Sequence, residues 1–126
     1  MVLVDTSVWI RALAGRNPYH DELDQLLSLD RVSGHALVYG ELLIGDIGGR
    51  KRLLAEYGRM HQVDMVPHHD AVALVRGRGL SGRGVGWIDI HLLASALVSK
   101  LHLWTADPRF AAMATELGVA YKLGGL

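Results

Sequence analysis

Four acidic residues stand among apolar neighbours, where an ionised carboxylate is costly to bury. Asp5 ends the apolar run 2–4, and Asp107 follows a second apolar run in LWTADPRF. Glu41 and Asp89 share helical faces with Leu and Val residues three or four positions away. Burying an ionised carboxylate costs several kcal/mol unless something compensates its charge. Four such residues point to one common cause, a bound cation.

A cluster of carboxylates suits a hard divalent cation. Converging like charges raise one another's pKa values or recruit a cation. The chain has 0 cysteines, so the ligands would be oxygens, which Mg²⁺ and Mn²⁺ prefer. Such ions deprotonate water and stabilise the leaving oxygen of a phosphodiester. Each acid also has a structural interpretation: Asp5, Asp89 and Asp107 as helix caps, and Glu41 as an exposed helical residue.

Alternating strand and helix patterns predict the elements that carry these acids. Short β-branched or apolar runs predict strands, and apolar residues spaced by three and four predict helices. The expected strands are 2–4, 31–34, 63–66, 101–104 and 119–121. The expected helices are one with Thr6 or Ser7 as its N-cap that stops before Gly15, then 19–29, 35–45, 50–61, 68–76, 87–99, and one from Pro108 to Gly118.

This alternation predicts an α/β fold, a three-layer α/β/α sandwich around a mainly parallel sheet of four to five strands. The length of 126 residues fits one domain over 1–126. In open parallel sheets, ligands bind beyond the carboxyl ends of the strands. Asp5 and Asp107 are expected at that edge, and the four acids converge if helices bring Glu41 and Asp89 there.

Four motifs of the chain resemble those of the PIN-domain ribonucleases, most closely the VapC-type toxins of toxin–antitoxin pairs. The motifs are VDTSVWI, ALVYGELLIG, GWIDIHLLASALV and LWTADPRF, in family order between residues 2 and 110. The resemblance implies a PIN-like fold and an endoribonuclease dependent on Mg²⁺ or Mn²⁺. It assigns the four metal-binding and catalytic acids to Asp5, Glu41, Asp89 and Asp107.

The resemblance also implies supporting residues and partners. Thr6 or Ser7 assists from the first loop, and Thr105 is the hydroxyl before the last acid. The family implies a homodimer and a small antitoxin whose tail occupies the groove of the site. Many relatives carry a further acid two residues after the last one. Here that position is Arg109, which puts a fifth ligand and tight binding of a second metal in doubt.

The charge balance restricts how the protein meets RNA. Lys plus Arg and Asp plus Glu each number 13, which argues against coating nucleic acid through net charge. Only 3 of the 13 cations are Lys, and Arg is the better bidentate partner for phosphate. The glycine-rich segment 76–86 is expected to be a loop at the rim of the site. Its arginines, Arg76, Arg78 and Arg83, and also Arg109, are expected to contact RNA; a merely solvated loop is the alternative.

Other patterns carry little function. Residues 77–82 spell G-x-G-x-x-G, but a dinucleotide fingerprint must follow a strand and open a helix. The seven histidines have no spacing that suits zinc, and the three tryptophans fit core or dimer packing better than base stacking. No apolar run approaches the roughly 20 residues that span a bilayer, and the start lacks a basic segment, so a cytoplasmic protein is expected.

Two other functions stay open at this point. A phosphomonoesterase could use Asp5 as its nucleophile, although Ser7 stands where such enzymes carry an acid–base aspartate. A non-catalytic PIN-like subunit that binds RNA or protein would need its acids only as helix caps. Cleavage of RNA that depends on a divalent ion and on the acids separates the nuclease from both.

Overall fold

The computed structural model describes residues 1–123. Apolar segments of two or three residues form the strands, and the amphipathic segments between them form helices. The elements follow in the order β1 (Val2–Val4), α1 (Thr6–Leu13), α2 (Tyr19–Ser28), β2 (Val32–Ser33), α3 (Ala36–Ile44), α4 (Lys51–Arg59), α5 (His68–Arg78), α6 (Trp87–Ser99), β3 (His102–Trp104) and α7 (Pro108–Glu116).

A parallel sheet in the order β2-β1-β3 forms the centre of the molecule. Val2 is paired with both Val32 and His102, so β1 is hydrogen-bonded on both sides. All three residues of β1 are buried, as expected for a central strand without polar side chains. Because the strands run parallel, the residues that follow them, Asp5 and Thr105, lie at the same edge. The Asp5 amide donates to the carbonyl oxygen of Trp104 at 2.9 Å.

The expected sheet of four to five strands is corrected to three strands within residues 1–123. The segments 63–66 and 119–121, predicted as strands, each adjoin only a single bridge, Gly34 with Gln62 and Leu103 with Ala120. Pro67 lacks an amide proton and starts the turn into α5, so the first segment has no length in which to continue pairing. The two bridges extend the parallel arrangement by one residue on each side.

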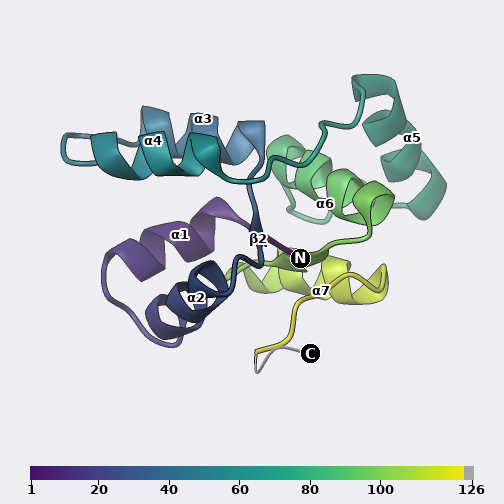
Figure 1. Cartoon of the computed structure of the whole chain (residues 1–126). Helices are drawn as coiled ribbons and strands as arrows, with labels where there is room; N and C mark the ends of the chain where they lie inside the picture. Colours follow the sequence, from purple (N-terminus) through teal and green to yellow (C-terminus); the bar gives the residue numbers. More distant parts are fainter. Residues whose placement is uncertain (124–126) are drawn as a thin grey trace.

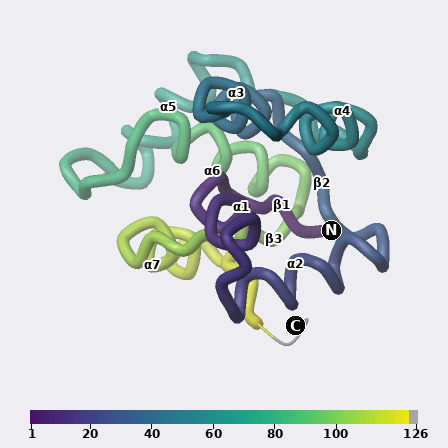
Figure 2. The backbone as a smooth tube through the Cα atoms, turned by 90° about the vertical axis from the view of Figure 1, so that its left-hand side faces the viewer, coloured from purple at the N-terminus to yellow at the C-terminus, as the bar shows by residue number. Residues whose placement is uncertain are grey.

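Helices cover both faces of the sheet. Figure 1 shows α3, α4 and α6 above the strands and α2 and α7 below them. Figure 2, turned by 90°, again shows the strands between these two groups. Leu3 in the sheet, Leu92 in α6 and Phe110 in α7 are all fully buried, so one apolar core joins the three layers. The predicted α/β/α architecture is confirmed.

Several predicted helix boundaries shift. Asp5 occupies the N-cap position of α1, and its side chain makes no capping bond. The prediction of Thr6 or Ser7 as N-cap is wrong, because both hydroxyls bond carboxylates instead. Helix α5 continues through Arg78 and ends at Gly79, whose φ of +64° suits glycine, so the loop predicted over 76–86 starts three residues later. Over residues 1–123, no helix combines the length and apolar character needed to span a bilayer.

Candidate active site

Two hydroxyl groups hold the side chain of Asp5, which is 5% exposed at the sheet edge. Ser7 Oγ donates to Asp5 Oδ2 at 2.8 Å, and Thr105 Oγ1 donates to the same oxygen at 2.7 Å. The amides of Ala106 and Asp107 donate in turn to Ser7 Oγ at 3.0 Å and Thr105 Oγ1 at 3.1 Å. Because each hydroxyl accepts from a backbone amide, its own proton is free to point at the carboxylate. The loop after β3 thereby fixes the orientation of Asp5.

Thr6 holds Glu41 at the same edge. Its hydroxyl donates to Glu41 Oε1 at 2.6 Å, a bond between residues 35 positions apart. Thr6 is buried, and α1 and α3 are in contact at this point. Consecutive residues at the start of α1 therefore position two acids from different elements, Asp5 through Ser7 and Glu41 through Thr6.

Asp89, in the first turn of α6, responds to the other three acids. Burial first, and then the charges of Asp5, Glu41 and Asp107, raise its pKa from 3.8 to about 7, against a hydrogen bond with the backbone of Gly86 that lowers it. A carboxyl group senses three other charges in this way only when they are close. The structure thus brings the four predicted acids within electrostatic reach of one another.

Asp107 has a second, structural role. Its Oδ1 accepts from the Arg109 amide at 2.9 Å and caps α7, with Pro108 at the first helical position as predicted. Asp89 also contributes to capping, because its carboxylate has a hydrogen bond with the backbone of Gly86, the N-cap of α6. Asp5 occupies the N-cap position of α1 but makes no side-chain capping bond. Capping therefore accounts for contacts of Asp107 and Asp89, and not for those of Asp5.

A buried polar network joins the helices that carry Glu41 and Asp89. His35 is 0% exposed; its Nδ1 accepts from the Leu37 amide at 3.0 Å, and its Nε2 lies 3.1 Å from Ser95 Oγ in α6. Since Nδ1 accepts, Nε2 carries the proton and donates to Ser95. The His35 amide donates to Tyr57 Oη at 2.9 Å, which adds α4 to the network.

The protonation state of this network is determined by its burial. Desolvation, followed by repulsion from His91, lowers the pKa of His35 from 6.5 to about 4. His35 is therefore neutral at neutral pH, as its hydrogen bonds require. His91 differs from the expectation of a satisfied or surface histidine, because it is buried and its Nδ1 has no hydrogen-bond partner among residues 1–123. Trp9 and Trp104 are buried as predicted, whereas Trp87 is 42% exposed.

The donor set of the site suits a hard divalent cation. Four carboxylates supply only oxygen, and the part of the Asp89 pKa shift that comes from the charges of the other three acids is a repulsion that a cation would relieve. Within the described residues 1–123, no three His, Asp or Glu side chains are arranged closely enough to hold a metal ion. The acids are in electrostatic contact without forming a ligand shell. Their chemistry fits Mg²⁺ or Mn²⁺.

The predicted arginines are placed differently from one another. Arg83 forms a bidentate ion pair with Glu116, so its charge is already compensated; this weakens its predicted contact with RNA phosphate. Arg109 lies against Gly84, where φ is +77° and a Cβ would be 2.7 Å from the guanidinium, so the loop and α7 meet there. Arg76 and Arg78 are exposed in the last turn of α5.

One fixed cation of α1 was not predicted from the sequence. Arg11 Nη1 donates to the carbonyl oxygen of Ser7, the residue whose hydroxyl holds Asp5, at 2.9 Å. The spacing of four places Ser7 and Arg11 on one face of α1, but this spacing alone does not indicate a functional cation.

Solved structures of similar fold share this architecture. PAE2754 from Pyrobaculum aerophilum superposes with a TM-score of 0.61 at 17% identity, covering 95% of this chain and 87% of the other. FitAcB from Neisseria gonorrhoeae superposes with a TM-score of 0.62 at 24% identity, covering 95% of each chain. At these identities the likeness supports the fold alone.

Sequence relatives define the family. The PIN domain family model matches residues 2–116, a span that contains all four acids. The chain is 42% identical over 121 residues to Ribonuclease VapC32 of Mycobacterium tuberculosis, from strains CDC 1551 / Oshkosh and ATCC 25618 / H37Rv, and the match covers 95% of this chain and 95% of each relative. The chain therefore belongs to the PIN-domain family, in its VapC-type branch.

Proposed function

We propose that this protein is an endoribonuclease dependent on Mg²⁺ or Mn²⁺ that acts as the toxin of a type II toxin–antitoxin pair. The observation that supports the proposal is the electrostatic effect of Asp5, Glu41 and Asp107 on Asp89, whose pKa burial and these three charges together raise to about 7. The 42% identity to a protein named as a ribonuclease supports RNA as the substrate. The same identity favours a nuclease over a phosphomonoesterase or a non-catalytic subunit.

Each acid has a role that its contacts support. Asp5, Glu41, Asp89 and Asp107 are the residues that would hold the divalent ion. When bound, such an ion activates water and stabilises the leaving oxygen of the phosphodiester. Ser7 and Thr105 keep Asp5 oriented, and Thr6 keeps Glu41 oriented, so neither acid must reorganise during the reaction. Without a cation the pKa of Asp89 is about 7, so binding of a divalent ion near neutral pH would displace a proton from this carboxyl group.

Cations around the site would bind the RNA backbone. Arg109 follows Asp107 by two residues and is exposed, and Arg76 and Arg78 are exposed at the end of α5. Arg83, already paired with Glu116, contributes less to this contact. Contacts with RNA phosphates do not depend on the base sequence. These residues would therefore provide affinity for RNA and no selectivity among target sequences.

The partners proposed for a VapC-type toxin are a small antitoxin and a second copy of the chain. An apolar groove between α1, α2 and α4, lined by Trp9, Leu27 and Leu53, supports binding of a protein partner. Ile44 at the end of α3 and Ile47 in the turn that follows are 88% and 103% exposed, and they support self-association. We expect a cytoplasmic protein. Size-exclusion chromatography with light scattering tests the dimer, and co-expression with a short reading frame beside the gene tests the antitoxin.

The metal-dependent activity has a direct test. Purified protein is incubated with a single-stranded RNA in Mg²⁺, in Mn²⁺ and in EDTA, and Asp5→Asn is compared with Asp70→Asn. Asp70 is the control, because it lies near a helix N-terminus, as Asp5 does, but is exposed and outside the cluster. Cleavage is expected in either metal and lost in EDTA and in Asp5→Asn. Cleavage that persists in EDTA and in Asp5→Asn rejects the proposal.

A further inference from the structure

Arg11 differs from other arginines of the chain in how its charge is held. Its guanidinium donates to the Ser7 carbonyl oxygen at 2.9 Å and lies over the ring of Tyr19, 5.8 Å from the ring centroid. It forms no ion pair with any carboxylate of residues 1–123, whereas Arg83 is paired with Glu116 and Arg52 with Glu56. A carbonyl and an aromatic ring fix the group while leaving its positive charge uncompensated.

The platform beneath Arg11 is itself held against the end of β3. The ring of Tyr19 is stacked on Trp104 at 6.1 Å and 25°, and Trp104 contacts Tyr121 at 5.5 Å. Trp104 is buried and directly precedes Thr105, the residue that donates to Asp5. Arg11 is therefore connected to the acid site twice, through Ser7 in α1 and through the aromatic stack beside β3.

An uncompensated cation is useful to a site that contains four acids. Carboxylates repel the phosphates of a polyanionic strand, so a substrate needs a nearby cation that the acids do not neutralise. Arg11 offers that cation one helical turn from Ser7, about 5.4 Å along the axis. Only one of its five N–H donors is used by Ser7, which leaves donors for a bidentate contact.

We infer that Arg11, held by Ser7 and Tyr19, is a binding site for a backbone phosphate of the RNA strand next to the acid cluster. This inference rests on the proposed ribonuclease function. It names a contact outside the four acids and outside the glycine-rich loop. Because the contact is to phosphate, it contributes affinity for any single-stranded RNA sequence rather than selectivity among sequences.

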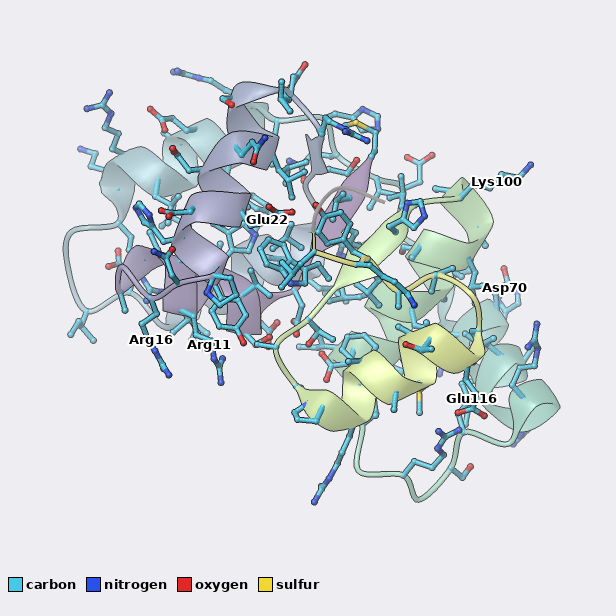
Figure 3. The ribbon with its side chains drawn as sticks, turned by 90° about the horizontal axis from the view of Figure 1, so that it is seen from below. Arg11, Arg16, Glu22, Asp70, Lys100 and Glu116 are labelled. Atoms are coloured by element: carbon cyan, nitrogen blue, oxygen red, sulfur yellow. The ribbon has the colours of Figure 1, made fainter. Side chains whose placement is uncertain are left out.

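Arg16 provides the matched control. It lies just beyond the end of α1, is exposed, and appears beside Arg11 at the same side of the molecule in Figure 3. Arg16 lacks the two contacts that fix Arg11. Its substitution therefore removes the same charge from this side of the molecule and leaves the proposed phosphate site intact. Tyr19→Leu removes the platform and keeps the cation, and Arg11→Lys keeps the charge and removes the planar fork.

The experiment measures binding of a fluorescent single-stranded RNA by anisotropy between 50 and 200 mM KCl, with Asp89→Asn as the background that prevents cleavage. Arg11→Met is expected to weaken binding about fivefold and to reduce the slope of log K against log salt by about 0.7. Tyr19→Leu and Arg11→Lys weaken binding about twofold to threefold, and Arg16→Met leaves it unchanged. In the chain that retains Asp89, Arg11→Met is expected to raise the KM for RNA cleavage by the same factor and to leave kcat within about twofold.

Thermal unfolding of each variant separates loss of binding from loss of fold. Equal binding by Arg11→Met and the background overturns the inference, and so does an equal loss in Arg11→Met and Arg16→Met, which would indicate diffuse charge. A chain that neither binds nor cleaves RNA rejects the proposed function itself. A chain that cleaves RNA while Arg11→Met behaves normally rejects only the phosphate site.

Discussion

Two polar clusters lie in this α/β fold, and they are stabilised in opposite ways. The network around His35 is neutral and buried, and each nitrogen of the imidazole has a hydrogen-bond partner. The acid cluster at the sheet edge gathers four carboxylates, and burial together with the charges of the other three raises the pKa of Asp89. The first cluster stabilises the fold. The second carries repulsion that the fold has to offset, as functional sites commonly do.

The positions of the two clusters explain how they coexist. His35 precedes Glu41 by six residues on the segment leading into α3, and Ser95 follows Asp89 by six residues on α6. The hydrogen bond between His35 and Ser95 thus joins the two helices whose acids repel each other. A neutral buried pair thus holds together two helices whose acids repel each other. Changes at each cluster should therefore have opposite effects on activity and stability.

The largest effect is expected for Asp89→Asn. The variant should lose at least about a hundredfold in RNA cleavage, since the acid can no longer exchange a proton or hold a cation. In metal-free buffer at pH 8 it should gain about 2 kcal/mol in unfolding free energy, roughly half of the full shift of three pH units at about 1.4 kcal/mol each, because the amide is still desolvated. Initial cleavage rates and urea unfolding measure the two effects. Asp70→Asn should change neither, and an inactive Asp89→Asn that is also less stable contradicts the comparison.

The second effect is a pair of opposing pH dependences. Between pH 4 and 6.5, His35 is protonated in the unfolded chain but neutral in the folded protein. The free energy of unfolding therefore falls as the pH drops. Between pH 3.8 and 7, the folded protein keeps a proton on Asp89 that the unfolded chain has released, so stability falls as the pH rises. Across their shared range the two slopes nearly cancel.

Single substitutions should expose each slope. In metal-free buffer, His35→Gln should leave a protein that loses up to about 1 kcal/mol of stability per pH unit as the pH rises toward 7. Asp89→Asn should leave one that loses stability as the pH falls below 6.5. Urea unfolding at intervals from pH 4.5 to 7.5 measures both. Parallel profiles for the two variants would show that these groups do not control the pH dependence.

The smallest effects come from two hydroxyls, one in each cluster. Ser95→Ala should cost about 1–2 kcal/mol of stability, because His35 Nε2 loses its acceptor, and it should leave cleavage within about twofold well below the melting temperature. Thr105→Val should lower cleavage about tenfold with little change in melting temperature, since Asp5 loses one of its two donors. Thermal unfolding and initial rates measure the pair. If the two variants exchange these outcomes, the assignment of one cluster to stability and the other to activity is wrong.

Much of the fold was predictable because local patterns decide it. The apolar run 2–4 and the amphipathic segments between strands were placed correctly, and so was Pro108 at the start of α7. The segments 63–66 and 119–121 have strand-like composition, yet each adjoins a sheet edge at only one bridge. How far an edge pairs depends on tertiary contacts and on Pro67, which composition alone does not reveal.

The site was predictable to a different degree. Asp5 follows a strand and Asp107 lies three residues beyond one, so parallel topology alone predicts that they approach. Glu41 and Asp89 lie on helices, and their convergence depended on the resemblance to a family. Arg11 and His35 had no distinctive pattern: one is fixed by an aromatic ring from another helix, and the other by a hydroxyl 60 positions away. The local periodicity of a sequence does not reveal contacts between residues that are far apart in the chain.

The central position of β1 in the sheet affects how the protein folds during its synthesis on the ribosome. Strand β1 is synthesised long before its partner β3, which is complete only at residue 104. Thr105 and Asp107 follow β3 in the chain. A nascent chain released before that point has an unpaired strand edge and lacks one of the four acids. The four acids cannot come together until residue 107 has been translated, so products that end before it would lack the proposed activity.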